Sequence, residues 1–156
     1  MTSTRSSTRV RCRVADERPE RGIIDTSVVI DLQRIDPVEL PRELAISAVT
    51  MAELAAGPHA TDDPVERSRR QDRLQRAEEV FEPLPVDRDV ARAFGRVYAA
   101  VAAAGRKARG RRALDLLIAA TAVAADLPLY TRNPEDFGAL GDLLEIVTVP
   151  TPPFIN

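Results

Sequence analysis

Residues 22–32 read GIIDTSVVIDL, and the interpretation of the whole chain begins there. Ile23 and Ile24 are β-branched and apolar, which indicates a buried strand. Asp25 follows directly, and the apolar pattern then resumes over about residues 27–34 with a helical period. A strand that runs at once into a helix predicts a parallel βα unit. The acid at the junction would then lie at the carboxyl edge of a sheet, where α/β proteins bind ligands.

The rest of the chain continues this alternation of short apolar strands and longer helical patterns. After the strand at 23–24, further strands are expected at 44–47, 81–86, 127–131 and 143–149. Helices are expected at 49–57, 64–80, 88–104 and 112–126, with Gly105 as the C-cap of the third. The pattern predicts an α/β domain with a mainly parallel central sheet.

The length and composition fit one globular domain. The chain has 156 residues, of which 44% are hydrophobic and 29% charged, an ordinary balance for a folded domain. We expect this domain to span residues 22–150. Residues 1–21 are polar without an apolar period and are predicted to be a disordered basic extension, a nucleic-acid-binding arm or sequence upstream of the true start. Residues 151–156 are expected to form a short tail.

Three features predict a cytoplasmic protein that does not associate with membranes. No run approaches the roughly 18 apolar residues that a membrane span needs. The N-terminus lacks the apolar core of a signal peptide. Cys12 is the only cysteine, so no disulfide can form within one chain.

The charges are distributed unevenly along the chain. Residues 1–21 hold six arginines and three acids, whereas the remainder holds 16 basic and 21 acidic residues. A net-acidic body is unlike a general nucleic-acid binder. Binding of a polyanion would therefore need a local basic patch or a bridging cation.

Acidic side chains recur where the predicted strands end. Besides Asp25, Glu53 lies early in the helix after the second strand, and Asp115 is the only charge between residues 113 and 125. The strand at 127–131 leads into a polar segment that offers Asn133, Glu135 and Asp136. Because parallel strands end at the same edge of a sheet, we expect these side chains to converge there.

Each acid also has an ordinary structural explanation. Asp25 could cap a helix, Thr50 and Glu53 could form a capping box, Asp115 could complement a helix dipole, and Asp136 could start a turn. Their coincidence at one edge nevertheless favours a shared function, since clustered carboxylates repel unless a cation neutralises them. Oxygen ligands without nearby His or Cys indicate Mg²⁺ or Mn²⁺.

Several other kinds of site are excluded or disfavoured. Cys12 and His59, the only soft metal ligands, are far apart, which argues against zinc, and His59 is expected in a surface loop. The sequence contains neither a G-x-G-x-x-G stretch nor a Walker A motif. An aspartyl-nucleophile phosphatase would need a second Asp where Ser27 stands.

Four segments in order resemble the PIN-domain ribonucleases, and most of all the VapC toxins of bacterial VapBC toxin–antitoxin pairs. They are IIDTSVVIDL (23–32), SAVTMAEL (47–54), LDLLIAATA (114–122) and LYTRNPEDF (129–137). The similarity covers nearly all of residues 22–149. It implies a three-layer α/β/α fold, an acidic Mg²⁺ or Mn²⁺ site and endonuclease activity on RNA. It also implies a homodimer and a hetero-oligomer with a small VapB-like antitoxin, whose C-terminal segment covers the active site.

The resemblance assigns site residues where the motifs match. The first family Asp falls on Asp25, with the following hydroxyl on Thr26, the family Glu on Glu53, and the helical Asp on Asp115. These residues are expected to hold one metal ion, directly or through water. The ion would activate a water for in-line attack on a phosphodiester. Thr26 is expected to orient Asp25 or a metal-bound water, or simply to cap a helix.

The fourth acidic position departs from the family pattern. Asn133 stands where many PIN domains have Asp, and Asp136 lies three residues further on. Either residue could complete the site, but Asn offers an oxygen without a charge. A second metal ion therefore has weaker support.

A basic segment, GRKARGRR (105–112), precedes Asp115. Its five cations could grip RNA phosphates, form a solvated connection, or dock an acidic antitoxin segment; they are Arg106, Lys107, Arg109, Arg111 and Arg112. Aromatic residues make up only 4% of the chain, so RNA choice is expected to rest on shape rather than base stacking. The charged helix at 64–80 is interpreted as a solvated face.

The favoured function is therefore that of a toxin ribonuclease, with two alternatives. A catalytically weak or degenerate PIN module would bind a partner protein without cutting, and Asn133 is the feature that favours it. An RNA-maturation PIN nuclease would share the chemistry, and an upstream gene for a small antitoxin would distinguish the toxin from it.

Overall fold

The computed structural model describes residues 18–151, so residues 1–17 of the predicted extension and 152–156 of the predicted tail lie outside the described residues. The strands are β1 Arg21–Ile24, β2 Glu43–Ala45, β3 Leu129–Thr131 and β4 Ile146–Thr148. The α-helices are α1 Thr26–Ile30, α2 Ala48–Ala56, α3 Pro64–Val80, α4 Arg88–Ala103 and α5 Arg111–Ala125. Short 3₁₀ helices are η1 Leu32–Arg34, η2 Pro37–Glu39, η3 Gly57–Ala60 and η4 Pro134–Leu140.

The strands within residues 18–151 form one four-stranded sheet in the order β2-β1-β3-β4, and every neighbouring pair is parallel. The predicted parallel α/β architecture is confirmed. Since β2 pairs with one side of β1 and β3 with the other, the chain reverses its direction of travel across the sheet at β1. The carboxyl ends of β1 and β3 therefore meet at a topological switch point, where open α/β sheets bind ligands.

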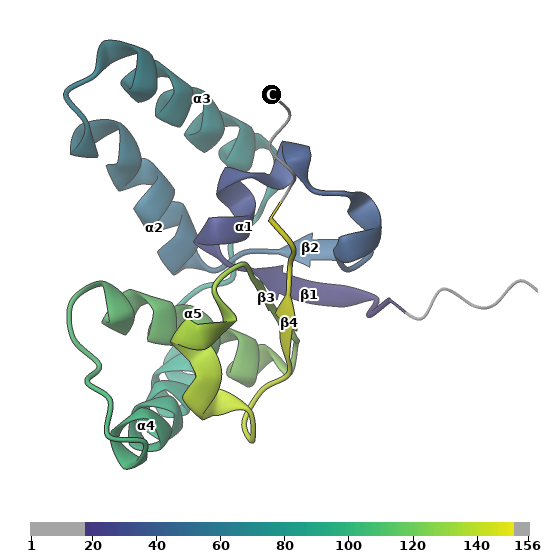
Figure 1. Ribbon diagram of the computed structural model, residues 1–156, viewed down its shortest axis with the longest axis vertical. Coiled ribbons are helices and arrows are strands. Elements are labelled where there is room, and N and C mark those ends of the chain that lie inside the picture. The colour runs from purple at the N-terminus through teal and green to yellow at the C-terminus, as the bar shows by residue number, and fades with distance from the viewer. Residues whose placement is uncertain (1–17, 152–156) are drawn as a thin grey trace, which may run out of the picture.

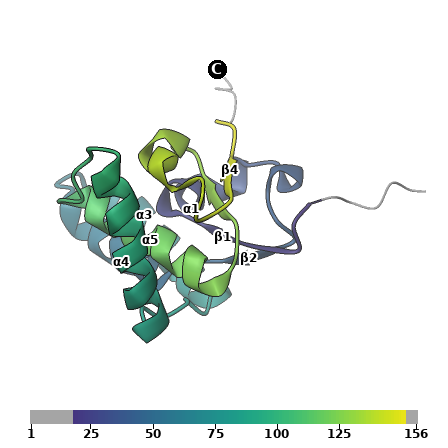
Figure 2. The same cartoon turned by 90° about the horizontal axis from the view of Figure 1, so that it is seen from below.

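Helices cover both faces of the sheet, with α1 and α3 above the strands in Figure 1 and α4 and α5 below them (Figures 1 and 2). The alternation of side chains along a strand explains the two cores. Ile23 and Leu129 belong to the apolar cluster shared with α4 and α5. Their neighbours Ile24 and Tyr130 belong to the cluster shared with α1 and α3. This is the three-layer α/β/α arrangement.

The predicted strand at 81–86 is wrong. In the described part of the chain these residues make a single parallel bridge, between Leu84 and Ser47. The Leu84 N–H donates to the Ile46 carbonyl at 2.9 Å, and its carbonyl accepts from Ala48 N–H at 2.8 Å. Pro83 and Pro85 on either side have no N–H to donate. These nitrogens would in any case face away from Ser47, and the pairing ends because the partner segment becomes helical at Ala48.

Two helices also differ from expectation. The helix predicted at 27–34 is divided into α1 and η1, which meet at Asp31. The capping box of Thr50 and Glu53 is absent from α2, because the N-cap is Ser47, whose hydroxyl accepts from Val49 N–H at 3.0 Å. Glu53 is thus available for another contact.

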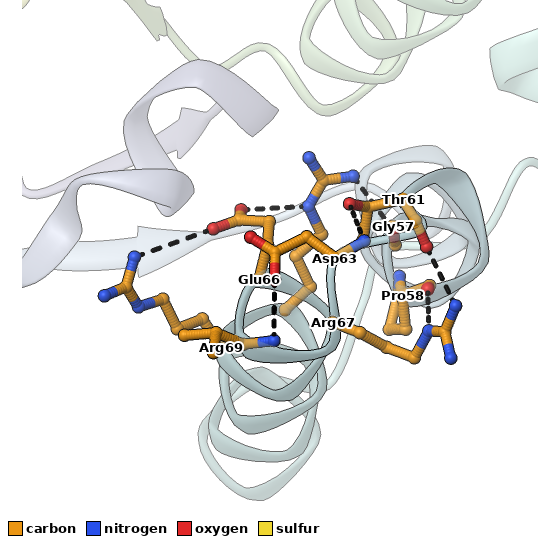
Figure 3. A network of polar contacts seen from close by, with 9 residues as sticks. Gly57, Pro58, Thr61, Asp63, Glu66, Arg67 and Arg69 are labelled. Carbon is orange, nitrogen blue, oxygen red and sulfur yellow. Dashed lines mark hydrogen bonds and ion pairs between the residues drawn. The ribbon is translucent and has the colours of Figure 1, made fainter.

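The charged helix α3 is tied to the end of α2 by two of its arginines (Figure 3). Arg67 donates to the carbonyls of Pro58 and Thr61, at 3.3 and 3.0 Å. Arg70 donates to the Gly57 carbonyl at 3.0 Å and pairs with Glu66. These bonds satisfy carbonyls around the short 3₁₀ turn after α2.

Helix α5 shares the larger core with α4 and the sheet. Its buried side chains include Leu116, Ile118 and Thr121. The same core includes strand residues such as Ile23 and Leu129, and Phe137 of η4. Along residues 18–151 no helix combines the length and apolar character that crossing a membrane requires.

Candidate active site

The predicted acidic residues share one pocket at the switch point. Asp25 follows β1, Glu53 lies on α2, and Asp115 lies on α5. The cavity has a volume of about 480 Å³, and its lining also includes Thr26, Ser27, Arg111, Arg112, Asn133, Glu135, Asp136 and Phe137. Every predicted acid therefore lies at the expected edge of the sheet.

Asp25 is held rigidly at the base of this pocket, where its side chain is 5% exposed. It caps α1, as its Oδ1 accepts from Val28 N–H at 3.2 Å and from the Ser27 hydroxyl at 2.5 Å. Burial raises the pKa of the Asp25 carboxyl above its ordinary range, while hydrogen bonds from Ser27, Thr131 and the backbone oppose the shift. Asp25 therefore both caps α1 and lines the acidic pocket.

Glu53 is positioned by Thr26, the residue after Asp25. The Thr26 hydroxyl donates to Glu53 Oε1 at 2.7 Å and lies 3.3 Å from the Thr50 hydroxyl. Thr50 is fully buried, so it anchors this contact from inside α2. The Thr26 side chain thus contacts Glu53 and not Asp25, which was one of its three expected roles. It is not the cap of α1 either, since that residue is Asp25.

Asp115 carries the clearest electrostatic signature of the pocket. Burial first, and then the charges of Glu53, Asp136 and Asp25, raise the pKa of Asp115 to about 6, and Arg111 opposes this. Asp115 lies beyond the first turn of α5, so the helix-dipole explanation is wrong. Its charge is disfavoured by its neighbours, as expected for clustered carboxylates without a bound cation.

The segment after β3 brings three polar residues to the rim. Asn133 is exposed and begins η4, and its N–H donates to the Thr131 hydroxyl at 3.0 Å. Glu135 and Asp136 follow in the first turn of η4. Asp136 is close enough to raise the pKa of Asp115, so it is the acid that faces the other carboxylates from this segment.

The basic segment is divided between two cavities. Arg111 and Arg112, in the first turn of α5, line the acidic pocket. Among the described side chains, Arg106, Lys107 and Arg109 line a separate small cavity beside Tyr98. Arg106 also donates to the Glu135 carbonyl at 2.9 Å, and this bond joins the basic loop to the rim of the pocket.

Sequence reasoning missed two hydroxyl residues that hold Asp25. Ser27 donates to Asp25 and accepts from Arg132 N–H at 3.1 Å, so it connects β1 to the segment after β3. Thr131 is fully buried and also bonds to Asp25. Ser27 could have been predicted, because it is a hydroxyl residue only two positions after Asp25 in the sequence. The contact of Thr131 with Asp25 could not, because it depends on the pairing of β1 with β3.

The carboxylate oxygens of the pocket have the ligand type and the negative charge that a hard divalent cation requires. Carboxylate oxygens from Asp25, Glu53, Asp115 and Asp136 converge, and such cations prefer oxygen ligands. In the conformation described for residues 18–151, no group of three or more His, Cys, Asp or Glu side chains forms a ready-made metal site. One oxygen of each of two carboxylates is occupied by a hydroxyl group: Asp25 Oδ1 accepts from Ser27, and Glu53 Oε1 accepts from Thr26.

Comparison with known proteins identifies what this chain is similar to. Residues 23–143 match the PIN domain family. Ribonuclease VapC5 of Mycobacterium tuberculosis is 37% identical over 125 residues, which cover 78% of this chain and 89% of that protein. Ribonuclease VapC1 of Methanocaldococcus jannaschii is 28% identical over 129 residues, covering 80% and 85%.

Solved structures agree with the sequence comparison. The crystal structure of VapBC-5 from Mycobacterium tuberculosis, a member of the VapBC family of toxin–antitoxin systems, contains a chain that superposes with a TM-score of 0.74. The two chains are 38% identical, and the match covers 84% of this chain and all of that one.

Proposed function

This chain belongs to the PIN domain family and is of the VapC type. From this we propose that it is an endoribonuclease, the toxin of a type II toxin–antitoxin pair. The reaction proposed is hydrolysis of an RNA phosphodiester. The observation that carries the proposal is the pocket itself. Asp25, Glu53 and Asp115 converge there at the end of the sheet, and two arginines flank them.

A divalent cation, Mg²⁺ or Mn²⁺, is the proposed cofactor. Asp25, Asp115 and Glu53 would hold it, with Asp136 as the favoured fourth residue because its charge acts on Asp115. Asn133 could contribute an uncharged oxygen. When bound, the ion would supply Lewis acidity toward the phosphoryl oxygens and a water of lowered pKa.

The side chains of this protein would position and neutralise the reacting groups. Ser27 and Val28 N–H orient Asp25, and Thr26 orients Glu53. Asp115, whose pKa is raised to about 6 by burial and the neighbouring acids, would be the carboxylate that gains most from a bound cation. Arg111 and Arg112 would contact the RNA phosphates next to the scissile bond, since cations supply backbone affinity.

The proposed protein partners are a VapB-like antitoxin and a second copy of the chain. One surface supports an antitoxin. Between α1 and α3 lies a cavity of about 500 Å³ lined by arginines and by the exposed apolar side chains Ile30 and Val80. Exposed apolar patches mark protein interaction sites. If Val80→Asp left co-purification with the cognate antitoxin intact, that surface would not support this partner.

The alternative is a PIN module that binds a partner without cutting RNA. The exposed Asn133 at the rim favours it, because this residue adds no charge. Asp136 opposes it, since it supplies an acid from the same segment. The nuclease is therefore the better supported function.

The direct test is cleavage of structured RNAs by antitoxin-free protein. The assay compares Mg²⁺, Mn²⁺ and EDTA, and it compares the wild type with Asp115→Asn. Asp62→Asn, at an exposed acid outside the pocket, is the matched control. We expect metal-dependent cleavage by the wild type and the control, and loss of at least 100-fold in Asp115→Asn, on the order of removing a key catalytic charge.

Two results would count against this proposal. Cleavage that persists in Asp115→Asn would contradict the assigned site. Folded wild-type protein that binds RNA but leaves a broad panel uncut with either metal would favour the partner-binding alternative.

A further inference from the structure

A second, smaller cavity adjoins the acidic pocket. It has a volume of about 120 Å³ and is lined by Tyr98, Ala102, Arg106, Lys107, Ala108 and Arg109. We call it the Tyr98 pocket. Tyr98 and Ala102 are one helical turn apart on α4, and the other residues come from the loop between α4 and α5.

The ring of Tyr98 is presented to solvent. The buried stripe of α4 consists of Val90, Ala93, Val97 and Val101, and Tyr98 lies outside it with 51% of its surface exposed. The ring of Phe94 lies 6.2 Å from it at an angle of 50°, which steadies the tyrosine from one side. The core thus does not account for an aromatic side chain here.

The Tyr98 pocket is connected to the acidic pocket at both ends of the loop. Arg106 lines the Tyr98 pocket and donates to the carbonyl of Glu135 at 2.9 Å, and Glu135 lines the acidic pocket. At the other end, Arg109 lines the Tyr98 pocket, while Arg111, two residues further on, lines the acidic pocket. The same loop thus contributes residues to both pockets, and Arg106 joins it to the rim of the acidic one.

The chemistry of the pocket suits a nucleotide. Three exposed cations, Arg106, Lys107 and Arg109, surround one exposed aromatic ring. Cations bind phosphates, and single-stranded RNA is bound by stacking its unpaired bases on aromatic rings or guanidinium planes. An acidic peptide would use the cations but would not require the ring. The small volume admits one base and not a helix.

We propose that the Tyr98 pocket binds one unpaired nucleotide of the RNA substrate, its base stacked on Tyr98 and its phosphates held by the loop cations. This rests on the proposed ribonuclease function and adds a specificity subsite to it. It also revises the expectation drawn from the low aromatic content, since one exposed ring at the right position suffices for a single base.

The test measures binding of short single-stranded RNAs to protein carrying Asp115→Asn, which is expected to prevent cleavage, at one fixed salt concentration. Tyr98→Ala should weaken binding about tenfold, the scale of one stacked base. Tyr98→Phe keeps the ring and should bind as the parent does. An RNA scanned with single abasic sites should lose affinity at one position, and Tyr98→Ala should then cause no further loss there, because both changes remove the same contact.

The outcomes separate this proposal from the proposed function. Binding within twofold of the parent for Tyr98→Ala would overturn the subsite, as would equal losses at every abasic position. Unchanged RNA binding with weakened binding of an acidic peptide would also overturn it and assign the pocket to a protein. If the abasic coupling is found but wild-type protein cuts no RNA with Mg²⁺ or Mn²⁺, the subsite stands and the nuclease proposal fails.

Discussion

Asp115 is the residue of the pocket whose ionisation is disfavoured both by burial and by the neighbouring carboxylates. Its pKa of about 6 lies above the ordinary value of 3.8, first because of burial and then because of the surrounding acids. Between these two values the folded protein binds the proton more tightly than the unfolded chain does. Without metal, the free energy of unfolding should therefore fall as the pH rises from about 4 to about 6, and this contribution should then level off.

Asp115→Asn should consequently stabilise the metal-free protein at pH 7.5. The full shift corresponds to about 3 kcal/mol, and partial exposure reduces the expected gain to about 1 kcal/mol. Urea unfolding in EDTA at pH 7.5 and pH 4 measures it. The advantage of Asp115→Asn over the wild type should disappear at pH 4, and a variant less stable than the wild type at pH 7.5 would refute the electrostatic account.

Gly22 is required by space rather than by backbone conformation. A Cβ atom there would lie 2.6 Å from Tyr130 Cε2 and 3.1 Å from Pro41 Cγ, and Tyr130 is buried in the neighbouring strand. Gly22→Ala should destabilise the protein by about 2 kcal/mol through overpacking. Gly95→Ala is the matched control, since a Cβ on that exposed helical residue meets nothing within 4 Å. It should stabilise by up to about 1 kcal/mol, and equal effects of the two changes in urea unfolding would contradict this reasoning.

At the scale of elements, the residue that ends α5 is unfavourable for stability, because a non-glycine residue there has a left-handed backbone conformation. Asp126 has φ 53° and ψ 48°, and the N–H groups of Asp126 and Leu127 bond back to the carbonyls of Val123 and Ala122. Gly105 occupies the same position after α4 with φ 72°, where its N–H and that of Arg106 make the equivalent bonds. Glycine suits this left-handed position, and a negative charge at a helix C-terminus is unfavourable.

Asp126→Gly should therefore raise the free energy of unfolding by about 1 kcal/mol, measured by thermal unfolding. Asp126→Ala removes the charge but keeps the Cβ, so it should gain less than Asp126→Gly. The reciprocal change, Gly105→Asp, should destabilise by a similar amount. Equal stabilities of Asp126→Ala and Asp126→Gly would mean that the charge, and not the backbone, is responsible.

The ion pair between Asp31 and Arg132 joins the end of α1 to the segment after β3. Both side chains are mostly buried, with 23% and 16% of their surfaces exposed, and within the described structure Arg132 Nε is buried without a hydrogen-bond partner. Asp31→Ala would leave the guanidinium without its carboxylate and should cost about 2–3 kcal/mol.

The double variant Asp31→Leu with Arg132→Met should recover most of that loss, because replacing a buried pair with apolar side chains is close to neutral. Glu43→Ala serves as the control, since its 3.1 Å pair with Arg21 is largely exposed, and it should cost less than about 1 kcal/mol. A double variant no more stable than Asp31→Ala would show that the charge of Arg132 is not the source of the loss.

At the scale of the whole molecule, the proposed metal site predicts that cation binding stabilises the fold. The metal-free fold holds several carboxylates that repel one another, so a cation that binds only the folded state should stabilise it. At a concentration ten times its Kd, Mn²⁺ should add about 1.4 kcal/mol. This corresponds to a rise in Tm of about 3–6 °C for a domain of this size.

Choline chloride at equal ionic strength is the control for screening, and it should produce little of this rise. Asp115→Asn should start from a higher Tm in EDTA but gain less from Mn²⁺, because it lacks one of the proposed ligands. The same rise in the wild type and in Asp115→Asn would mean that Mn²⁺ binds elsewhere.

The amino-acid pattern was sufficient for the architecture and for the principal acids. Alternating strands and helices predicted the parallel sheet, and the positions of Asp25, Glu53 and Asp115 at its carboxyl edge follow from that topology alone. The bounds of α3, residues 64–80, were predicted without error because Asp63 and Pro64 are strong local start signals. These features depend on residues close together in the chain, where propensity and periodicity act.

The features that were wrong or missed depend on contacts between distant segments. Leu84 forms only one bridge because its partner Ser47 is the N-cap of α2, where the partner segment becomes helical. Glu53 does not form the predicted capping box but accepts a hydrogen bond from Thr26, 27 residues away. Ser27 bonds both to Asp25 and to the backbone of Arg132, 105 residues further along the chain. The basic loop was divided between two pockets by the packing of α4, α5 and η4. Which partner a polar side chain finds is set by the packed core that brings segments together, and no local pattern in the sequence encodes it.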